Sequence, residues 1–206
     1  MIAAINTFLS LGDSYTIGES VNLFESFPYQ TIALLRRKGF PFNAPEIVAK
    51  TGWTTDELKA QLERSTLLPF YDIVTLLIGV NNQYRERSAE EYRLHFEDLL
   101  NRAITLARND SKNVYVLSIP DWGVTPFGTQ SAREKISLEI DRYNSLNKEL
   151  SKDYYTNYID ITTGNRLRAK NEEQVVAADG LHPNAYEYSH WAALLAEAIE
   201  KKLNVR

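Results

Sequence analysis

The segment Asp72–Gly79, DIVTLLIG, is almost continuously apolar and rich in β-branched residues. Such a strand is typical of a central position in a parallel sheet that helices cover on both faces. Similar runs at Thr7–Leu11 (TFLSL) and Val114–Ile119 (VYVLSI) predict two further buried strands. Shorter strands are expected at Glu46–Ala49 and Tyr158–Ile161. The sequence therefore predicts five strands, spread over most of the chain.

Helical segments alternate with these strands. Helical apolar spacing begins at Pro28 and ends in Arg36, Arg37 and Lys38, just before Gly39. Three more helices are expected after capping-box patterns, at Thr54 with Glu57, at Ser88 with Glu91 and at Ser131 with Glu134, and Pro183 is expected to open a last helix. Because long crossovers join the strands, this order predicts an α/β fold, a three-layer α/β/α sandwich around a parallel sheet. No linker divides the chain, so a single domain over residues 1–206 is expected.

Composition narrows the classes of function. Of 206 residues, 23 are basic and 27 acidic, and no segment concentrates Lys and Arg, so nucleic acid is not an expected partner. The chain has no cysteine, which excludes disulfides and thiol nucleophiles. No apolar run could span a bilayer and the N-terminus has no signal-peptide pattern, which predicts a cytoplasmic protein unless an export signal was removed. Oligomeric state cannot be read from the sequence.

Common cofactor motifs are missing from the sequence, which has no GxGxxG, no P-loop ending in Gly-Lys-Ser/Thr and no HExxH. The three histidines are His95, His182 and His190, and no two have the four-residue spacing that places two imidazoles on one metal ion. We therefore expect neither a metal nor an organic cofactor.

Ser14 follows the first predicted strand across Gly12-Asp13, so its hydroxyl is expected at the carboxyl edge of the sheet. A nucleophile needs that exposure. Taken alone, Ser14 or Asp13 is more simply explained as a cap or turn residue. The segment GDSYT is also not the nucleophile elbow of α/β-hydrolases, because it lacks the second glycine of G-x-S-x-G.

His182 lies three residues after Asp179 in the segment DGLHP. The carboxylate could accept a hydrogen bond from one ring nitrogen and leave the other to take a proton from a serine. An ordinary loop near a helix start is the simpler explanation if the segment stands alone. His95 and His190 lie in predicted helices, where packing or solvent exposure explains them.

Acyl transfer also needs donors aimed at the developing oxyanion. Gly52, in KTGWT, follows the second strand and would let a carbonyl approach the backbone closely. Asn81, in GVNN, follows the central strand and could supply a side-chain N–H. Considered singly, each is as well explained as a turn residue.

The four segments, in this order, resemble the SGNH (GDSL-type) hydrolases, a family of serine esterases and lysophospholipase-like enzymes. FLSLGDSYT matches the first block, Gly52 the second, GVNN the third and DGLHP the last. The resemblance implies a flavodoxin-like sheet, a catalytic triad of Ser14, Asp179 and His182, and an oxyanion hole formed by Ser14, Gly52 and Asn81. The third block usually reads Asn-Asp, whereas this chain has Asn82 in place of the aspartate and so lacks a carboxylate that often supports the loop.

The expected reaction is hydrolysis of carboxylic esters through an acyl-enzyme on Ser14, with activity falling as His182 is protonated. The resemblance leaves the substrate open among acetyl esters, other acyl esters, lysophospholipids and thioesters. The alternative is a catalytically lapsed binding or scaffold protein of the same fold. Nucleotide binding is disfavoured, because no glycine loop is present to hold a phosphate.

Several large or charged side chains are expected in loops around the site. Trp53, Tyr84 and Trp122 could form an apolar acyl pocket or a stacking platform for a sugar, or could simply pack. Arg85 and Arg87 could meet an anionic substrate, although a solvated charge cluster explains them more simply.

Overall fold

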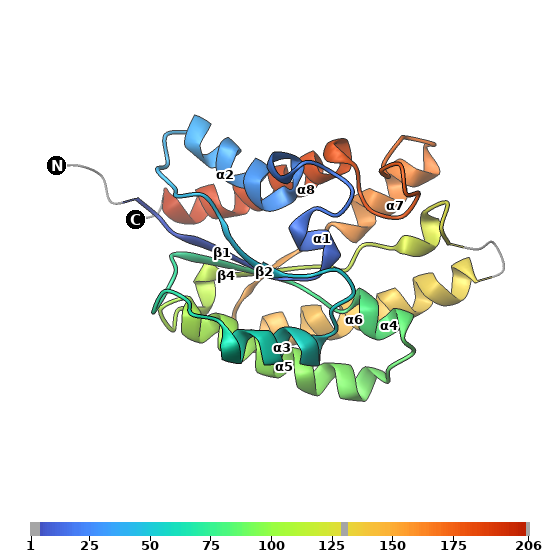
Figure 1. Cartoon of the computed structure of the whole chain (residues 1–206), viewed down its shortest axis with the longest axis horizontal. Helices are drawn as coiled ribbons and strands as arrows, with labels where there is room; N and C mark the ends of the chain where they lie inside the picture. Colours follow the sequence, from blue (N-terminus) through green and yellow to red (C-terminus); the bar gives the residue numbers. More distant parts are fainter. Residues whose placement is uncertain (1–4, 129–131, 205–206) are drawn as a thin grey trace.

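A computed structural model, which describes residues 5–128 and 132–204, has a five-stranded parallel sheet between two layers of helices (Figure 1). The strands are β1 (Phe8–Gly12), β2 (Glu46–Ala49), β3 (Ile73–Leu77), β4 (Val114–Leu117) and β5 (Asn157–Ile159). Their order across the sheet is β2-β1-β3-β4-β5, and every neighbouring pair is parallel. The predicted α/β sandwich and flavodoxin-like sheet are confirmed, and β3 holds the central position predicted for it.

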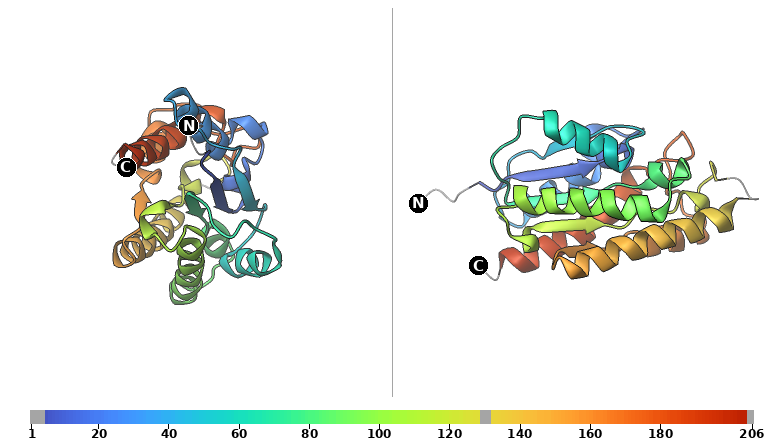
Figure 2. Two further views of the ribbon diagram at one scale, coloured as in Figure 1. Left: turned by 90° about the vertical axis from the view of Figure 1, so that its left-hand side faces the viewer. Right: turned by 90° about the horizontal axis from the view of Figure 1, so that it is seen from below.

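Helices cover both faces of the sheet. The helices are α1 (Ser14–Ile17), α2 (Phe27–Arg37), α3 (Thr55–Arg64), α4 (Val80–Tyr84), α5 (Ala89–Leu106), α6 (Arg133–Asp153), α7 (Thr162–Lys170) and α8 (Ala185–Leu203), with short 3-10 helices at η1 (Leu23–Glu25), η2 (Ser111–Asn113) and η3 (Trp122–Val124). α2 and α8 pack side by side on one face, and α3, α5 and α6 cover the other (Figures 1 and 2). Within the described residues, no helix is long and apolar enough to cross a membrane.

The sheet places the end of β1 directly against β3. In the β1–β3 register Gly12 pairs with Leu77, and a Cβ on Gly12 would lie 2.3 Å from the carbonyl oxygen of Leu77. No side chain larger than hydrogen fits there, so the glycine allows the chain to turn sharply from β1 into α1. Ser14 consequently starts a helix at the carboxyl edge of the sheet, where ligands bind in this class of fold.

A buried polar cluster fixes the C-terminal helices. Glu187 is fully buried at the start of α8 and accepts hydrogen bonds from Arg168 Nε at 2.6 Å and Nη2 at 2.7 Å. It also accepts one from the indole Nε1 of Trp191 at 2.8 Å. Because a buried carboxylate needs such partners, this cluster ties α7 to α8 and holds the loop between them at the sheet edge.

Several predicted boundaries differ from those observed, for example β5, which spans Asn157–Ile159 rather than Tyr158–Ile161, and three α-helices were not predicted. α8 begins at Ala185, since the side chain of Asn184, and not Pro183, caps the helix by accepting from Glu187 N at 2.9 Å. α6 begins at Arg133 with Ala132 at the cap position, and Ser131, the predicted cap, lies outside the described residues. The helices α1 and α4 have only four and five residues, too few to leave a periodic apolar pattern. α7 is mostly polar, which explains why it was not predicted.

Candidate active site

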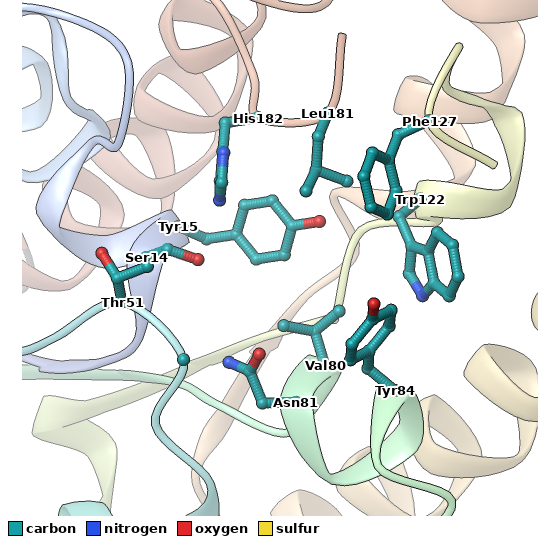
Figure 3. Close-up of a pocket in the computed structure, with 11 residues that line it drawn as sticks. Ser14, Tyr15, Thr51, Val80, Asn81, Tyr84, Trp122, Phe127, Leu181 and His182 are labelled. Atoms are coloured by element: carbon teal, nitrogen blue, oxygen red, sulfur yellow. The ribbon is translucent and has the colours of Figure 1, made fainter. Parts of the chain in front are cut away.

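A pocket of about 230 Å³ opens at the carboxyl edge of the sheet. Ser14, Gly52, Asn81 and His182 all line it (Figure 3). They come from the ends of three neighbouring strands and from the loop before α8. The structure thus brings four of the five sequence-predicted site residues to one cavity, and the fifth, Asp179, contacts His182 beside it.

Ser14 is the first residue of α1, and its conformation is set by the residue before it. The carboxylate of Asp13 caps the helix by accepting from Tyr15 N at 3.0 Å. Ser14 is 5% exposed and lines the pocket, and the ring of His182 points toward it from above in Figure 3. Within the described part of the chain no hydrogen bond joins Ser14 to His182, and catalytic hydrogen bonds commonly tighten only when substrate is bound.

Asp179 and His182 form a charge-assisted pair. The imidazole Nδ1 lies 2.6 Å from Asp179 Oδ2, while Oδ1 accepts from the backbone N–H groups of Leu181 at 2.9 Å and His182 at 3.0 Å. Ser20 Oγ donates to Oδ2 at 2.6 Å. Burial alone would raise the pKa of Asp179, but the hydrogen bonds from Ser20, Leu181 and His182 outweigh it and hold the pKa well below its usual value. The carboxylate therefore stays ionised and orients the ring.

Gly52 and Asn81 also line the pocket. Gly52 has a φ of +84°, a left-handed conformation that favours glycine, and its carbonyl accepts from Arg85 Nη2 at 2.7 Å. The Asn81 side chain donates one N–H to the Trp53 carbonyl at 3.0 Å. An amide nitrogen carries two hydrogens, so one N–H of Asn81 is left for a ligand in the pocket.

Asn82, which replaces the usual aspartate, lies behind the pocket. The residue is fully buried, accepts from Thr55 N at 3.1 Å and donates to Thr55 Oγ1 at 2.8 Å. An amide can do both at once because it carries a donor and an acceptor. Asn82 therefore ties α4 to the start of α3, and the loop keeps its support without a carboxylate.

Asp13 is buried beneath the site. Burial raises the pKa of this carboxyl to about 7, against the opposing effect of backbone N–H groups at Tyr15, Asp13 and Gly79. Its Oδ2 atom has no hydrogen-bond partner in the described part of the structure. Asp13 is thus a neighbour of Ser14 that changes charge close to neutral pH.

The outer wall of the pocket is aromatic and aliphatic. Tyr84 and Phe127 pack against opposite sides of Trp122, with ring centroids 5.6 and 6.0 Å away. The indole N–H of Trp122 is held by Gln83 Oε1 at 2.7 Å. Val80 and Leu181 complete this wall (Figure 3).

Other residues singled out in the sequence lie outside the pocket. Trp53 packs against the hydrophobic core and does not line the pocket. Arg85 pairs with Glu57 and Arg87 with Asp56, as expected of a solvated charge cluster. His95 is 3.9 Å from Glu91 on α5, and His190 Nδ1 is 3.0 Å from the Tyr186 carbonyl on α8. Among the described residues, no three His, Asp or Glu side chains are grouped as a metal site.

Six residues of the site were not identified from the sequence. Ser20 supports Asp179, and five others line the pocket: Tyr15, Thr51, Val80, Phe127 and Leu181. All of these pocket residues except Phe127 adjoin predicted site residues, so adjacency could have indicated them. Ser20 is distant from Asp179 in the sequence, and no local pattern indicates that the two meet.

Comparisons with known proteins place the sequence in a family and match its fold. The sequence model of the GDSL-like lipase/acylhydrolase family matches residues 10–199. A comparison with curated proteins found no match.

Solved structures share the fold at low identity. A lipase/acylhydrolase from Enterococcus faecalis has a TM-score of 0.71 at 20% identity, covering 96% of this chain and 97% of that one. An acetylxylan esterase from Geobacillus stearothermophilus has a TM-score of 0.72 at 18% identity, covering 97% and 94%. A member of the lipolytic G-D-S-L family from Veillonella parvula DSM 2008 has a TM-score of 0.69 at 19% identity, covering 95% and 96%.

Proposed function

This chain belongs to the GDSL-like lipase/acylhydrolase family and is an esterase, and on that premise we propose that it cleaves neutral carboxylic esters through a covalent acyl-enzyme on Ser14. The resemblance that its four sequence segments carried is confirmed by the family match. The observation that carries the mechanism is the pair formed by Asp179 and His182, with Nδ1 and Oδ2 2.6 Å apart and the ring directed toward Ser14 (Figure 3).

His182 acts as the general base. With Nδ1–H held by Asp179, Nε2 is left to take the proton of Ser14 as its Oγ attacks the ester carbonyl. The new bond joins Oγ to the carbonyl carbon, and the carbonyl electron pair moves onto oxygen. When the tetrahedral intermediate collapses, the bond to the alcohol oxygen breaks and His182 returns the proton to the leaving alcohol. Water then attacks the acyl-enzyme by the same route and releases the acid.

The tetrahedral oxyanion needs donors that are already in place. We assign this role to the backbone N–H groups of Ser14 and Gly52 and to the second side-chain N–H of Asn81. Arg85 on the Gly52 carbonyl and the Trp53 carbonyl on Asn81 hold two of these donors in position before substrate arrives. Such preorganisation matters because each donor typically contributes about 10²–10³-fold to the rate.

The substrate proposed is neutral and small or slender. None of the described residues lining the pocket is an Asp, Glu, Lys or Arg, and the wall away from Ser14 is formed by Val80, Leu181 and the rings around Trp122. An anionic group would enter without a countercharge. A cavity of about 230 Å³ matches a short acyl chain or a small alcohol group rather than a whole long-chain lipid.

The proposal is tested with p-nitrophenyl esters of increasing acyl length, on wild type and Ser14→Ala. We expect hydrolysis by the wild type and a loss of about 10⁴-fold or more in the variant. Fluorophosphonate treatment followed by mass spectrometry should show one adduct on Ser14. Correctly folded protein with neither turnover nor adduct would instead support the binding or scaffold alternative.

A further inference from the structure

The buried end of the pocket holds a hydroxyl group that the proposed reaction does not use. Tyr15 is 3% exposed and its ring lies edge-on to His182, with centroids 5.7 Å apart, and edge-on to Trp191 at 6.2 Å. These contacts fix the ring, so the position of its hydroxyl is fixed too. Figure 3 shows the hydroxyl pointing into the pocket, toward Leu181, Phe127 and Trp122 and above Val80.

Among the described residues, no protein group satisfies this hydroxyl. Across residues 5–128 and 132–204, Tyr15 Oη makes no hydrogen bond, whereas the Trp122 N–H and His182 Nδ1 beside it both have partners. In the main pocket Val80, Leu181 and Phe127 have no polar side-chain atoms, and the N–H of Trp122 is held by Gln83. Tyr15 also borders a cavity of about 10 Å³ with Asp121, Thr125 and Asn165, but its hydroxyl bonds to none of them. Among the described residues Tyr15 therefore has no partner, and a molecule in the main pocket can supply one.

The hydroxyl is also available as a donor at every working pH. Burial, followed by the charges of Asp13, Asp121 and Asp179, raises the pKa of Tyr15 well above its ordinary value, so the phenol stays protonated. A neutral phenol donates one hydrogen bond and accepts another. Its ideal occupant carries an oxygen atom, such as an ether, hydroxyl or carbonyl oxygen.

We propose that Tyr15 selects esters whose buried substituent carries a hydrogen-bonding oxygen, over hydrocarbon esters of the same size. This inference rests on the proposed function, because it takes the pocket beside Ser14 to be the ester site. A pure hydrocarbon group would expel water and leave the hydroxyl unpaired. This should lower kcat/KM for the hydrocarbon ester about tenfold or more relative to the oxygen ester. The oxygen can belong to the acyl or the alcohol side of the ester.

The test compares esters that differ by one oxygen in place of one methylene. On the acyl side the pairs are p-nitrophenyl methoxyacetate with butanoate and p-nitrophenyl methoxypropanoate with pentanoate. On the alcohol side the pair is methoxyethyl acetate with butyl acetate, and their hydrolysis is measured through the acid that is released. For each pair the quantity measured is the kcat/KM of the oxygen ester divided by that of the hydrocarbon ester, in wild type and in Tyr15→Phe. Dividing the two ratios cancels the intrinsic reactivity of the esters.

We expect this ratio to fall about tenfold in Tyr15→Phe for at least one pair, and the pair affected identifies the acyl or the alcohol side. Tyr188→Phe is the matched control. Its hydroxyl is buried and has no hydrogen-bond partner among the described residues, and its ring also contacts Trp191, but Tyr188 does not line the pocket. Its ratios should equal those of wild type. If Tyr15→Phe changes all esters by one common factor, or none of them, the inference is wrong.

A binding measurement separates this inference from the proposed function. Ser14→Ala, with and without Tyr15→Phe, is titrated with the same ester pairs while tryptophan fluorescence is followed, since Trp122 lines the pocket. A preference for the oxygen esters that Tyr15→Phe removes supports the inference even if wild type shows no Ser14-dependent turnover. Ser14-dependent turnover without any such preference overturns the inference and leaves the esterase mechanism intact.

Discussion

Ser20 and Asp179 are 159 residues apart in the sequence, yet Ser20 Oγ donates a 2.6 Å hydrogen bond to Asp179 Oδ2. The same oxygen binds His182 Nδ1. The position of the carboxylate relative to the imidazole is thus shared between the loop after α1 and the loop before α8. Ser20 adopts this position with a φ of +66°, which is uncommon for a residue other than glycine.

Replacing Ser20 should therefore lower the rate rather than the affinity. In Ser20→Ala we expect kcat to fall about tenfold with little change in KM, because one of the hydrogen bonds that orient Asp179 is lost. Steady-state kinetics measure this. Ser20→Gly removes the same hydroxyl but relaxes the backbone, so it should lose activity equally while being no less stable. Full activity in Ser20→Gly would show that the hydroxyl has no positioning role.

A side chain on Gly52 should disturb the proposed oxyanion site. In Gly52→Ala the left-handed conformation costs about 1–2 kcal/mol, and any relaxation moves the N–H, so we expect kcat to fall about 10–100-fold. The added Cβ would meet only Arg85 Nη2, at 3.8 Å, so a clash cannot explain the loss.

Gly39 offers the matched control for that substitution. It has a φ of +88° with open space around it, and it lies outside the residues that line the pocket. Gly39→Ala should lose similar unfolding free energy, measured with urea, but no activity. Equal losses of kcat in the two variants would mean that Gly52 acts through stability alone.

Position 82 should accept aspartate, the acidic isostere of asparagine, with a smaller loss than leucine. In Asn82→Leu the backbone N–H and hydroxyl of Thr55 are left unpaired, which should cost about 2–4 kcal/mol of unfolding free energy and displace Asn81. In Asn82→Asp both Thr55 groups can donate to the carboxylate, so more stability and activity should remain. Denaturant unfolding and kcat/KM measure both effects. An Asn82→Leu protein as active as wild type would contradict this account.

Asp13 should make stability depend on pH in an unusual direction. Its folded pKa of about 7 exceeds the usual aspartate value, so between about pH 4 and pH 7 the folded protein keeps a proton that the unfolded chain has released. Its contribution to stability therefore falls as pH rises through this window, by at most about 4 kcal/mol. Asp13→Asn should gain unfolding free energy relative to wild type between pH 5 and pH 8. The prediction would be wrong if the difference in unfolding free energy between Asp13→Asn and wild type were the same at about pH 5 and at about pH 8.

Much of the fold could be predicted from the sequence, because long apolar segments carry their own periodicity. The strand at β3 is continuously apolar, and α3 begins after the Thr54–Glu57 capping box that the sequence indicates. α1 and α4 could not be predicted this way. They are single turns of four and five residues, too short to leave a periodic apolar pattern.

The candidate site was predicted only as far as its motifs reach. Ser14, Gly52, Asn81 and His182 each lie in a recognisable segment, and they line one pocket. Ser20 and Phe127 contribute through contacts between segments distant in the sequence, for which a single sequence carries no signal. Trp53 was expected in a loop around the site, but it is partly buried, packs against the core and does not line the pocket.

The split of the site between the first strand and the last loop also bears on how the protein is made. During synthesis Ser14 is made long before His182 and Asp179, the base and carboxylate proposed for it, which lie in the segment before α8. α8 must then dock beside α2, where Gln30 Nε2 donates to the Ala185 carbonyl at 3.0 Å. Until that step Ser14 lacks the imidazole that the proposed mechanism requires. A chain truncated before His182 should therefore show no Ser14-dependent hydrolysis.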